Sequence, residues 1–302
     1  MTNRYLIGLA GCLVIVGASY IALNRVEGQP KISDLDLAIW VYVQFFLSTA
    51  FIYVFSIVLW RFFARQFGIR KDLGIAFIDM GLFAVGKYFP GKIWGIFARG
   101  ACDGADKITI TRTNVLVSTA EQIYCLGVGV LVGTALALIS LPDIGGALAS
   151  IVVISVLALC VLMQRLGVWI LDISNKFRLP ATFISMTNRL ILANGYIGLW
   201  LLTSLPLIIL IGSSHTLNLS EAAALMAAFT CAMIAGWIAV FAPGGIGIRE
   251  ASFVLLAPAW LTWQEAVFWI TLHRMLFTLF DLCFGVITVG IATFRYRLSL
   301  SS

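Results

Sequence analysis

The chain has 302 residues, of which 61% are hydrophobic and only 11% are charged. A soluble domain of this length needs far more polar surface, so the composition predicts a polytopic membrane protein without a separate catalytic domain. The net charge of +6 comes from short basic loops between apolar runs. That distribution is typical of membrane topology, and it argues against nucleic acid as a partner.

Motifs for metal, nucleotide or hydrolytic chemistry are missing from the sequence. The six cysteines are scattered without a CxxC pair, and His215 and His273 are the only histidines, which speaks against a zinc site. Residues 86–92 fit the GxxxxGK pattern, but Ile93 stands where a P-loop needs Ser or Thr. We therefore predict no metal, no cofactor and no catalytic residues, and we do not expect an enzyme.

Apolar runs of spanning length, about 20 residues, occur six times along the chain. They lie at 5–23, 37–60, 113–139, 145–163, 190–212 and 264–292. Two further apolar regions, 73–98 and 222–261, are each broken by a Pro-Gly segment. We predict that each broken region forms a re-entrant hairpin, which enters and leaves the membrane on the same side.

The positive-inside rule supports this arrangement. With two hairpins, nearly all loop Lys and Arg residues fall on one side of the membrane, and only Arg25 and Lys31 fall on the other. If 73–98 crossed the membrane instead, the basic loop 164–189 would become external. We therefore predict a multi-pass protein of the cytoplasmic (inner) membrane with both termini in the cytoplasm.

The order span, span, hairpin, span occurs in residues 1–139 and again in residues 140–302. Each half then crosses the membrane an odd number of times, so the second half must be inverted relative to the first. The predicted fold is an all-α polytopic integral membrane protein with six full spans and two re-entrant helical hairpins, arranged as two inverted repeats. Transporters often have this plan, with the binding site near the midplane.

The two Pro-Gly segments resemble each other. The first is KYFPGKIWG at 87–95, followed by Arg99, and the second is FAPGGIGIRE at 241–250. A short helix that begins after each break would point free N–H groups into the protein interior, where they favour an anion. We predict that a phosphate headgroup binds there. The candidate substrate-binding residues are Lys87, Pro90, Gly91, Lys92, Arg99, Gly244, Gly245, Arg249 and Arg274.

Three acidic residues are candidates for balancing charge or for coupling transport to protons: Glu121, Glu250 and Asp281. Helical spacing places Asp281 on the same face as Arg274, and Asp79 on the same face as Lys87. An unpaired charge at the bilayer centre costs about 2.5–3.5 kcal/mol on insertion scales. The alternative interpretation is that these residues form structural ion pairs, or that the basic ones reach the headgroup region.

On these motifs the chain resembles flippase-like membrane proteins related to the transmembrane region of lysylphosphatidylglycerol synthase. The resemblance covers residues 5–292, and it rests on the first Pro-Gly segment with Arg99, on residues 243–250, and on Glu121 and Arg274. It implies translocation of a membrane lipid: a phospholipid, an aminoacyl-lipid or a polyprenyl-linked sugar. The chain stops at Ser302 without a synthase domain, so aminoacyl transfer is not expected. It carries Gln122 where relatives often carry Arg, which leaves the partner of Glu121 open.

The predicted function is therefore a flippase- or scramblase-type transporter for a lipid with a polar or phosphate-containing headgroup. One alternative is an intramembrane enzyme acting on a phospholipid or polyprenyl-linked substrate, for which Asp103 and Asp106 are the clustered acids near the membrane surface. Another is a non-transporting subunit of an envelope lipid or polysaccharide pathway, with biosynthetic proteins as partners.

Overall fold

The computed structural model describes Tyr20 and residues 37–88, 93–100, 112–140, 185–239 and 242–301. Within these ranges every regular element is a helix, and five helical stretches are long and apolar enough to cross a membrane. The predicted all-helical fold is thereby confirmed for the described residues, with five helices that could cross a membrane. The stretches are α2 (Ile39–Arg65), α5 (Arg112–Ile139), α7 (Met186–Thr203) continued by α8 (Leu205–Gly212), α9 (Leu219–Ile238) and α11 (Trp263–Ser301).

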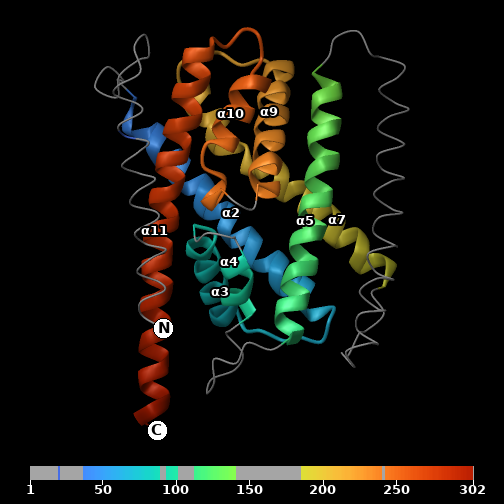
Figure 1. Ribbon diagram of the computed structural model, residues 1–302, viewed down its shortest axis with the longest axis vertical. Coiled ribbons are helices and arrows are strands. Elements are labelled where there is room, and N and C mark those ends of the chain that lie inside the picture. Colours follow the sequence, from blue (N-terminus) through green and yellow to red (C-terminus); the bar gives the residue numbers. More distant parts are fainter. Residues whose placement is uncertain are drawn as a thin grey trace.

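Helix breaks occur in both regions that carry a Pro-Gly segment, as predicted. The first region contains α3 (Leu73–Gly86) and α4 (Ile93–Gly100), and the second contains α9 and α10 (Ile248–Leu256). In each region the two helices pack against each other. Figure 1 shows α9 and α10 toward one end of the long axis of the molecule and α3 and α4 toward the other.

The predicted spans 5–23 and 145–163 lie outside the described residues, apart from Tyr20. Elsewhere the expected boundaries differ from the observed ones in two ways. The span at 190–212 consists of two helices, because Pro206 cannot donate the backbone bond that would continue α7. Finally, α9 has 20 residues and is long enough to cross a membrane without α10.

Local sequence explains where these helices begin. The Asp72 side chain accepts a 2.6 Å hydrogen bond from the backbone N–H of Ile75 and caps α3. Asn218 and Glu221 form a capping box at the start of α9. At the second break Gly244 has φ 58°, a left-handed conformation that side chains disfavour, so glycine allows the chain to turn between α9 and α10.

Helices from the two halves of the chain pack against each other reciprocally: α5 packs on α9, and α3 packs on α11. The second contact is close, because a Cβ atom on Gly81 would lie 2.0 Å from Oγ1 of Thr288. The absence of a side chain at Gly81 therefore sets the separation of α3 and α11. Behind them α2 crosses obliquely (Figure 1) and contacts α7 and α8.

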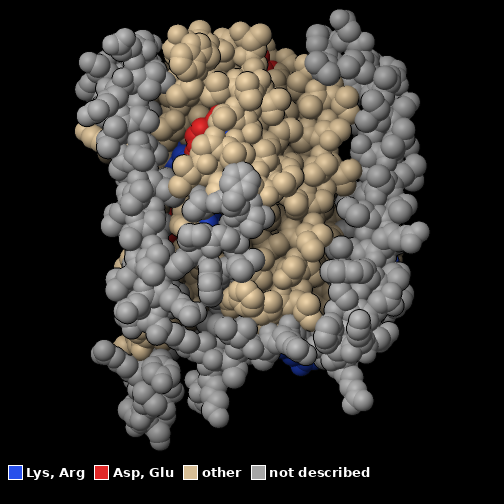
Figure 2. Space-filling model, in the orientation of Figure 1, with Lys and Arg blue, Asp and Glu red and all other residues tan. Residues whose placement is uncertain are grey.

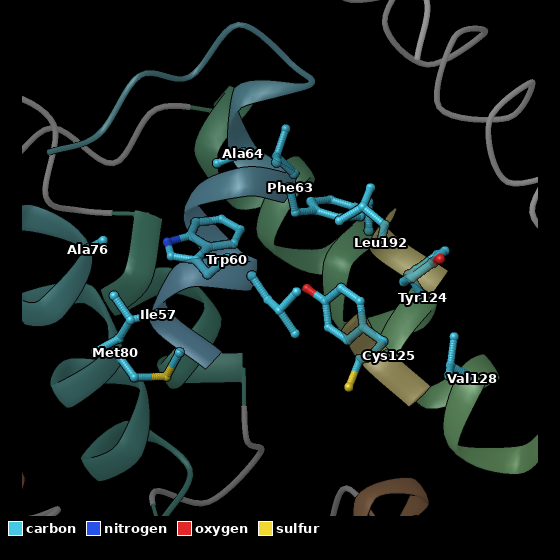
Figure 3. Close-up of a cluster of buried hydrophobic side chains, with 14 of the residues drawn as sticks. Ile57, Trp60, Phe63, Ala64, Ala76, Met80, Tyr124, Cys125, Val128 and Leu192 are labelled. Atoms are coloured by element: carbon cyan, nitrogen blue, oxygen red, sulfur yellow. The ribbon is translucent and has the colours of Figure 1, made fainter. Parts of the chain in front are cut away.

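A cluster of buried apolar side chains holds α2, α3, α5 and α7 together (Figure 3). Trp60 of α2 is fully buried, and Phe63, Met80, Tyr124 and Leu192 pack in the same cluster. Burial of aromatic and aliphatic side chains such as these contributes about 1.5–3 kcal/mol each. This core fixes the base of the first hairpin against three other helices.

Candidate functional site

The two broken regions touch each other at their breaks. We call Lys87 and Tyr88, which follow α3, the first tip, and Pro243–Gly245, which lie between α9 and α10, the second tip. The backbone N–H of Gly244 donates a 2.9 Å hydrogen bond to the carbonyl oxygen of Lys87. The ring of Tyr88 covers the same glycine, since a Cβ atom there would lie 2.9 Å from Tyr88 Cδ1. The two segments that the sequence singled out therefore form one site.

Asp281 of α11 joins the first tip to two other elements. Its carboxylate lies 2.6 Å from Nζ of Lys87 and accepts hydrogen bonds from the hydroxyls of Tyr53 in α2 and Tyr88. Asp281 is fully buried. A buried carboxylate needs such partners to remain ionised at low cost, so Asp281 fixes the position of the first tip.

Arg274 of α11 holds the second tip in a corresponding way. Its Nη1 lies 2.6 Å from Oε1 of Glu250, and its Nη2 donates a 2.9 Å hydrogen bond to the carbonyl oxygen of Gly244. A further, longer bond of 3.5 Å reaches the carbonyl of Gly245. Asp281 and Arg274 of α11 thus each bind one of the two broken regions.

Arg249 differs from the other charged residues of the site. No carboxylate of the described residues lies within ion-pair distance of its guanidinium, and its buried Nε atom has no hydrogen-bond partner among them. The side chain lies against Gly236 of α9, where a Cβ atom would be 2.2 Å from Arg249 Cγ. Arg249 is half-buried, and a charge that is partly removed from water without a counter-ion is costly, which makes this residue a candidate for binding an anion.

A cavity of about 50 Å³ lies beside Arg249, large enough for a few water molecules. Four buried polar atoms among its lining residues have no hydrogen-bond partner in the described part of the chain. They are Nε of Arg249, Oε2 of Glu250, Nε2 of His273 and Nε of Arg274. Orphaned buried polar atoms are rare in proteins, so four around one cavity indicate a binding site for a polar ligand. Figure 2 shows acidic and basic side chains in a recess near α10 and α11.

Arg99 and Glu121 lie in a second, separate polar cluster. Their side chains form a 2.7 Å ion pair, Tyr196 donates a 2.6 Å hydrogen bond to Glu121, and the Arg99 guanidinium lies 3.9 Å from the ring centre of Trp60. Beside them Lys71 pairs with Asp79 at 2.6 Å. Every charge in this cluster has an ion-pair partner, although Nε of Arg99 and Oδ1 of Asp79 make no hydrogen bond within the described part of the chain. We therefore assign Arg99 and Glu121 to holding α4 against α5, as in the structural ion-pair alternative.

Two pairings suggested by helical spacing are wrong. Asp79 pairs with Lys71 rather than Lys87, because Lys87 lies at the end of α3 and points to α11. Arg274 and Asp281 are separated by about 10 Å along α11, and each meets a different hairpin tip instead.

Several site predictions are outside the described residues: Pro90, Gly91 and Lys92 of the first Pro-Gly segment of the sequence, and Asp103 and Asp106, on which the enzyme alternative depends. Conversely, sequence reasoning missed residues that line or support the site. Tyr53, Tyr88 and His273 were not selected, because an aromatic side chain in an apolar run gives no signal of its polar contact. The only hint was that His273 is one of two histidines.

The described residues form a helical protein with five helices long and apolar enough to cross a membrane, and a small cavity with several polar side chains in its wall lies where two interrupted helix pairs meet. Comparison with protein-family models finds no match, and comparison with curated proteins finds none either. The function must therefore be argued from the geometry of the site.

Proposed function

We propose that the protein is a flippase- or scramblase-type transporter, which moves a lipid with a phosphate-containing headgroup across the cytoplasmic membrane. The observation that carries the proposal is Arg249, a guanidinium without an ion-pair partner among the described residues, beside a cavity at the junction of two interrupted helix pairs. A positive charge in such a place favours an anion, and arginine can hold a phosphate through two parallel hydrogen bonds.

We further propose that the chain is built from six spans and two inverted repeats, residues 1–139 and 140–302. Two features support this arrangement. The packing of α5 on α9 is matched by the packing of α11 on α3. In addition, each hairpin's second helix pairs with the span that follows it, through Arg99–Glu121 in one half and Glu250–Arg274 in the other. In the first half the basic residue is on the short helix and the acidic residue on the span, and in the second half the order is reversed.

In the proposed mechanism the phosphate binds Arg249 and Arg274, while the apolar tails stay in the lipid. The present cavity is too small for a complete headgroup, so the two tips must separate during passage. The Gly244–Lys87 hydrogen bond then breaks, and Asp281 keeps the first tip attached to α11. Without a nucleotide-binding motif in the sequence, movement is downhill or driven by an ion gradient.

Reconstitution in liposomes with acyl-chain-labelled fluorescent phospholipids tests this function, with dithionite reduction reporting the outer-leaflet fraction. Arg249→Met should slow translocation at least about tenfold, because a hydrogen bond to a charged group contributes about 1.5–3 kcal/mol. Arg70→Gln is the matched control, since Arg70 is an exposed arginine outside the site. Normal translocation by Arg249→Met, or none by the unaltered protein with any phospholipid tested, would refute the proposal.

A further inference from the structure

We infer that the cavity selects a headgroup with a single negative charge and a hydroxyl group: a phosphodiester whose second substituent is a polyol, such as glycerol or a sugar. This inference deepens the proposed function and rests on it for the lipid nature of the ligand. It excludes aminoalkyl zwitterions and cationic headgroups as preferred ligands. Two independent features of the site support it.

The first feature is the charge of the site. Lys87 is neutralised by Asp281 at 2.6 Å, and Arg274 by Glu250 at 2.6 Å. Arg249 remains, so the described residues of the site carry one positive charge in excess. A phosphodiester monoanion cancels this charge, whereas a zwitterion leaves it in place and a cationic headgroup adds to it. Uncompensated charge is strongly disfavoured in a buried, low-dielectric site.

The second feature is an acceptor without a donor. Glu250 uses Oε1 for Arg274, but its Oε2 is buried without a hydrogen-bond partner, and an ionised carboxylate oxygen can only accept. His273 lies beside it in the cavity wall with an unpartnered Nε2, and only 6% of this residue is exposed. A ligand hydroxyl can donate to Glu250 without bringing charge. An ammonium group would also donate, but it would restore the excess positive charge next to two arginines.

Short-chain lipids test both features on the purified full-length protein in an uncharged detergent. The probes are the dihexanoyl forms of phosphatidylglycerol, phosphatidylethanolamine and phosphatidylmethanol, and binding is measured by thermal stabilisation, which increases with affinity. Phosphatidylmethanol has the same charge as phosphatidylglycerol but lacks its hydroxyls. Phosphatidylglycerol should bind at least about tenfold more tightly than either of the others.

Variants assign the two preferences to residues. Arg249→Met should remove the preference over phosphatidylethanolamine, and Glu250→Gln should reduce the preference over phosphatidylmethanol. Arg70→Gln should change neither. Equal or tighter binding of phosphatidylethanolamine would overturn the charge argument, and equal binding of phosphatidylmethanol would overturn the hydroxyl argument.

The free headgroup, glycerophosphoglycerol, distinguishes a lipid site from a site for soluble phosphodiesters. It should bind at least about tenfold more weakly than the dihexanoyl lipid, because it lacks the apolar contacts of the tails. Equal affinity would overturn the lipid part of the inference. Binding selectivity as expected without translocation in liposomes would refute the proposed transport and leave the ligand assignment standing, so the two failures are distinguishable.

Discussion

The backbone N–H of Gly244 donates a hydrogen bond of 2.9 Å to the carbonyl oxygen of Lys87. This single bond joins two Pro-Gly segments from different halves of the chain. It also satisfies one backbone donor and one backbone acceptor at the two helix breaks, and unsatisfied backbone groups are costly in a membrane. The site therefore depends on the fit between the two tips as much as on its charges.

Gly244→Ala should disrupt this fit. The new methyl group would meet the Tyr88 ring at 2.9 Å in a backbone with φ 58°. We expect a loss of about 2–4 kcal/mol in the free energy of unfolding, from left-handed strain and overpacking together. The control is the same change in a Tyr88→Ala background, where the left-handed backbone of Gly244 remains but the ring contact is gone. Thermal unfolding in detergent measures the single and double variants, and an equal loss from Gly244→Ala in both backgrounds would contradict the role of the Tyr88 contact.

Gly81→Ala should separate α3 from α11. Its methyl group would lie 2.0 Å from Oγ1 of Thr288 and 2.5 Å from Thr288 Cβ, so a rotamer change alone cannot make room. Overpacking of this kind costs about 1–3 kcal/mol. Gly290→Ala in α11 has no neighbour within 4 Å of its Cβ atom and should keep or raise the melting temperature. Destabilisation of the control to the same extent would contradict the packing argument.

The Arg99–Glu121 pair should behave as a structural element. Arg99→Met leaves a buried carboxylate without its counter-charge and should cost about 3–5 kcal/mol. Replacing both partners, as Arg99→Met with Glu121→Met, should recover much of this loss, because neither charge is then left alone. A double-mutant cycle on chemical unfolding measures the coupling. If the double variant loses translocation while it regains stability, these residues take part in transport after all.

Arg249→Met, unlike Arg99→Met, should raise the stability of the unliganded protein and lower its transport activity. The unliganded protein should gain about 1–3 kcal/mol, since an ionised group at the bilayer centre costs about 2.5–3.5 kcal/mol on insertion scales. The same variant should lose translocation. The comparison requires thermal unfolding in detergent without added lipid, with Arg70→Gln as the unaffected reference. A variant that is less stable than the unaltered protein would show that Arg249 has a structural role.

Cysteine accessibility tests the proposed membrane topology. In a cysteine-free background, Thr216→Cys, in the exposed turn between α8 and α9, should react with an impermeant maleimide added to intact cells. Arg70→Cys, in the exposed turn before α3, should react only after permeabilisation, because the positive-inside rule places this turn in the cytoplasm. Labelling of both positions from the same side would rule out the inverted arrangement.

The local features of this protein could be read directly from its sequence. Apolar composition predicts membrane helices because the bilayer selects long apolar segments. The helix break at Pro243 and Gly244, and the end of α3 before the Pro90-Gly91 pair of the sequence, follow from backbone properties of proline and glycine that need no distant partner. The prediction of Arg249 as a binding residue rests on its place next to such a break, and it stays a prediction.

The local sequence could not predict which acidic side chain pairs with which basic side chain. Helical spacing identifies neighbours on one helix, and it paired Asp281 with Arg274 and Asp79 with Lys87. In the folded protein Asp281 binds Lys87, Tyr53 and Tyr88 from two other segments, and Glu250 takes Arg274. Electrostatic and hydrogen-bond energies depend on distances in space, and only the packing of α11 against both tips sets those distances. The same packing leaves Arg249 as the one charge of the described site without a counter-ion, on which the proposed function rests.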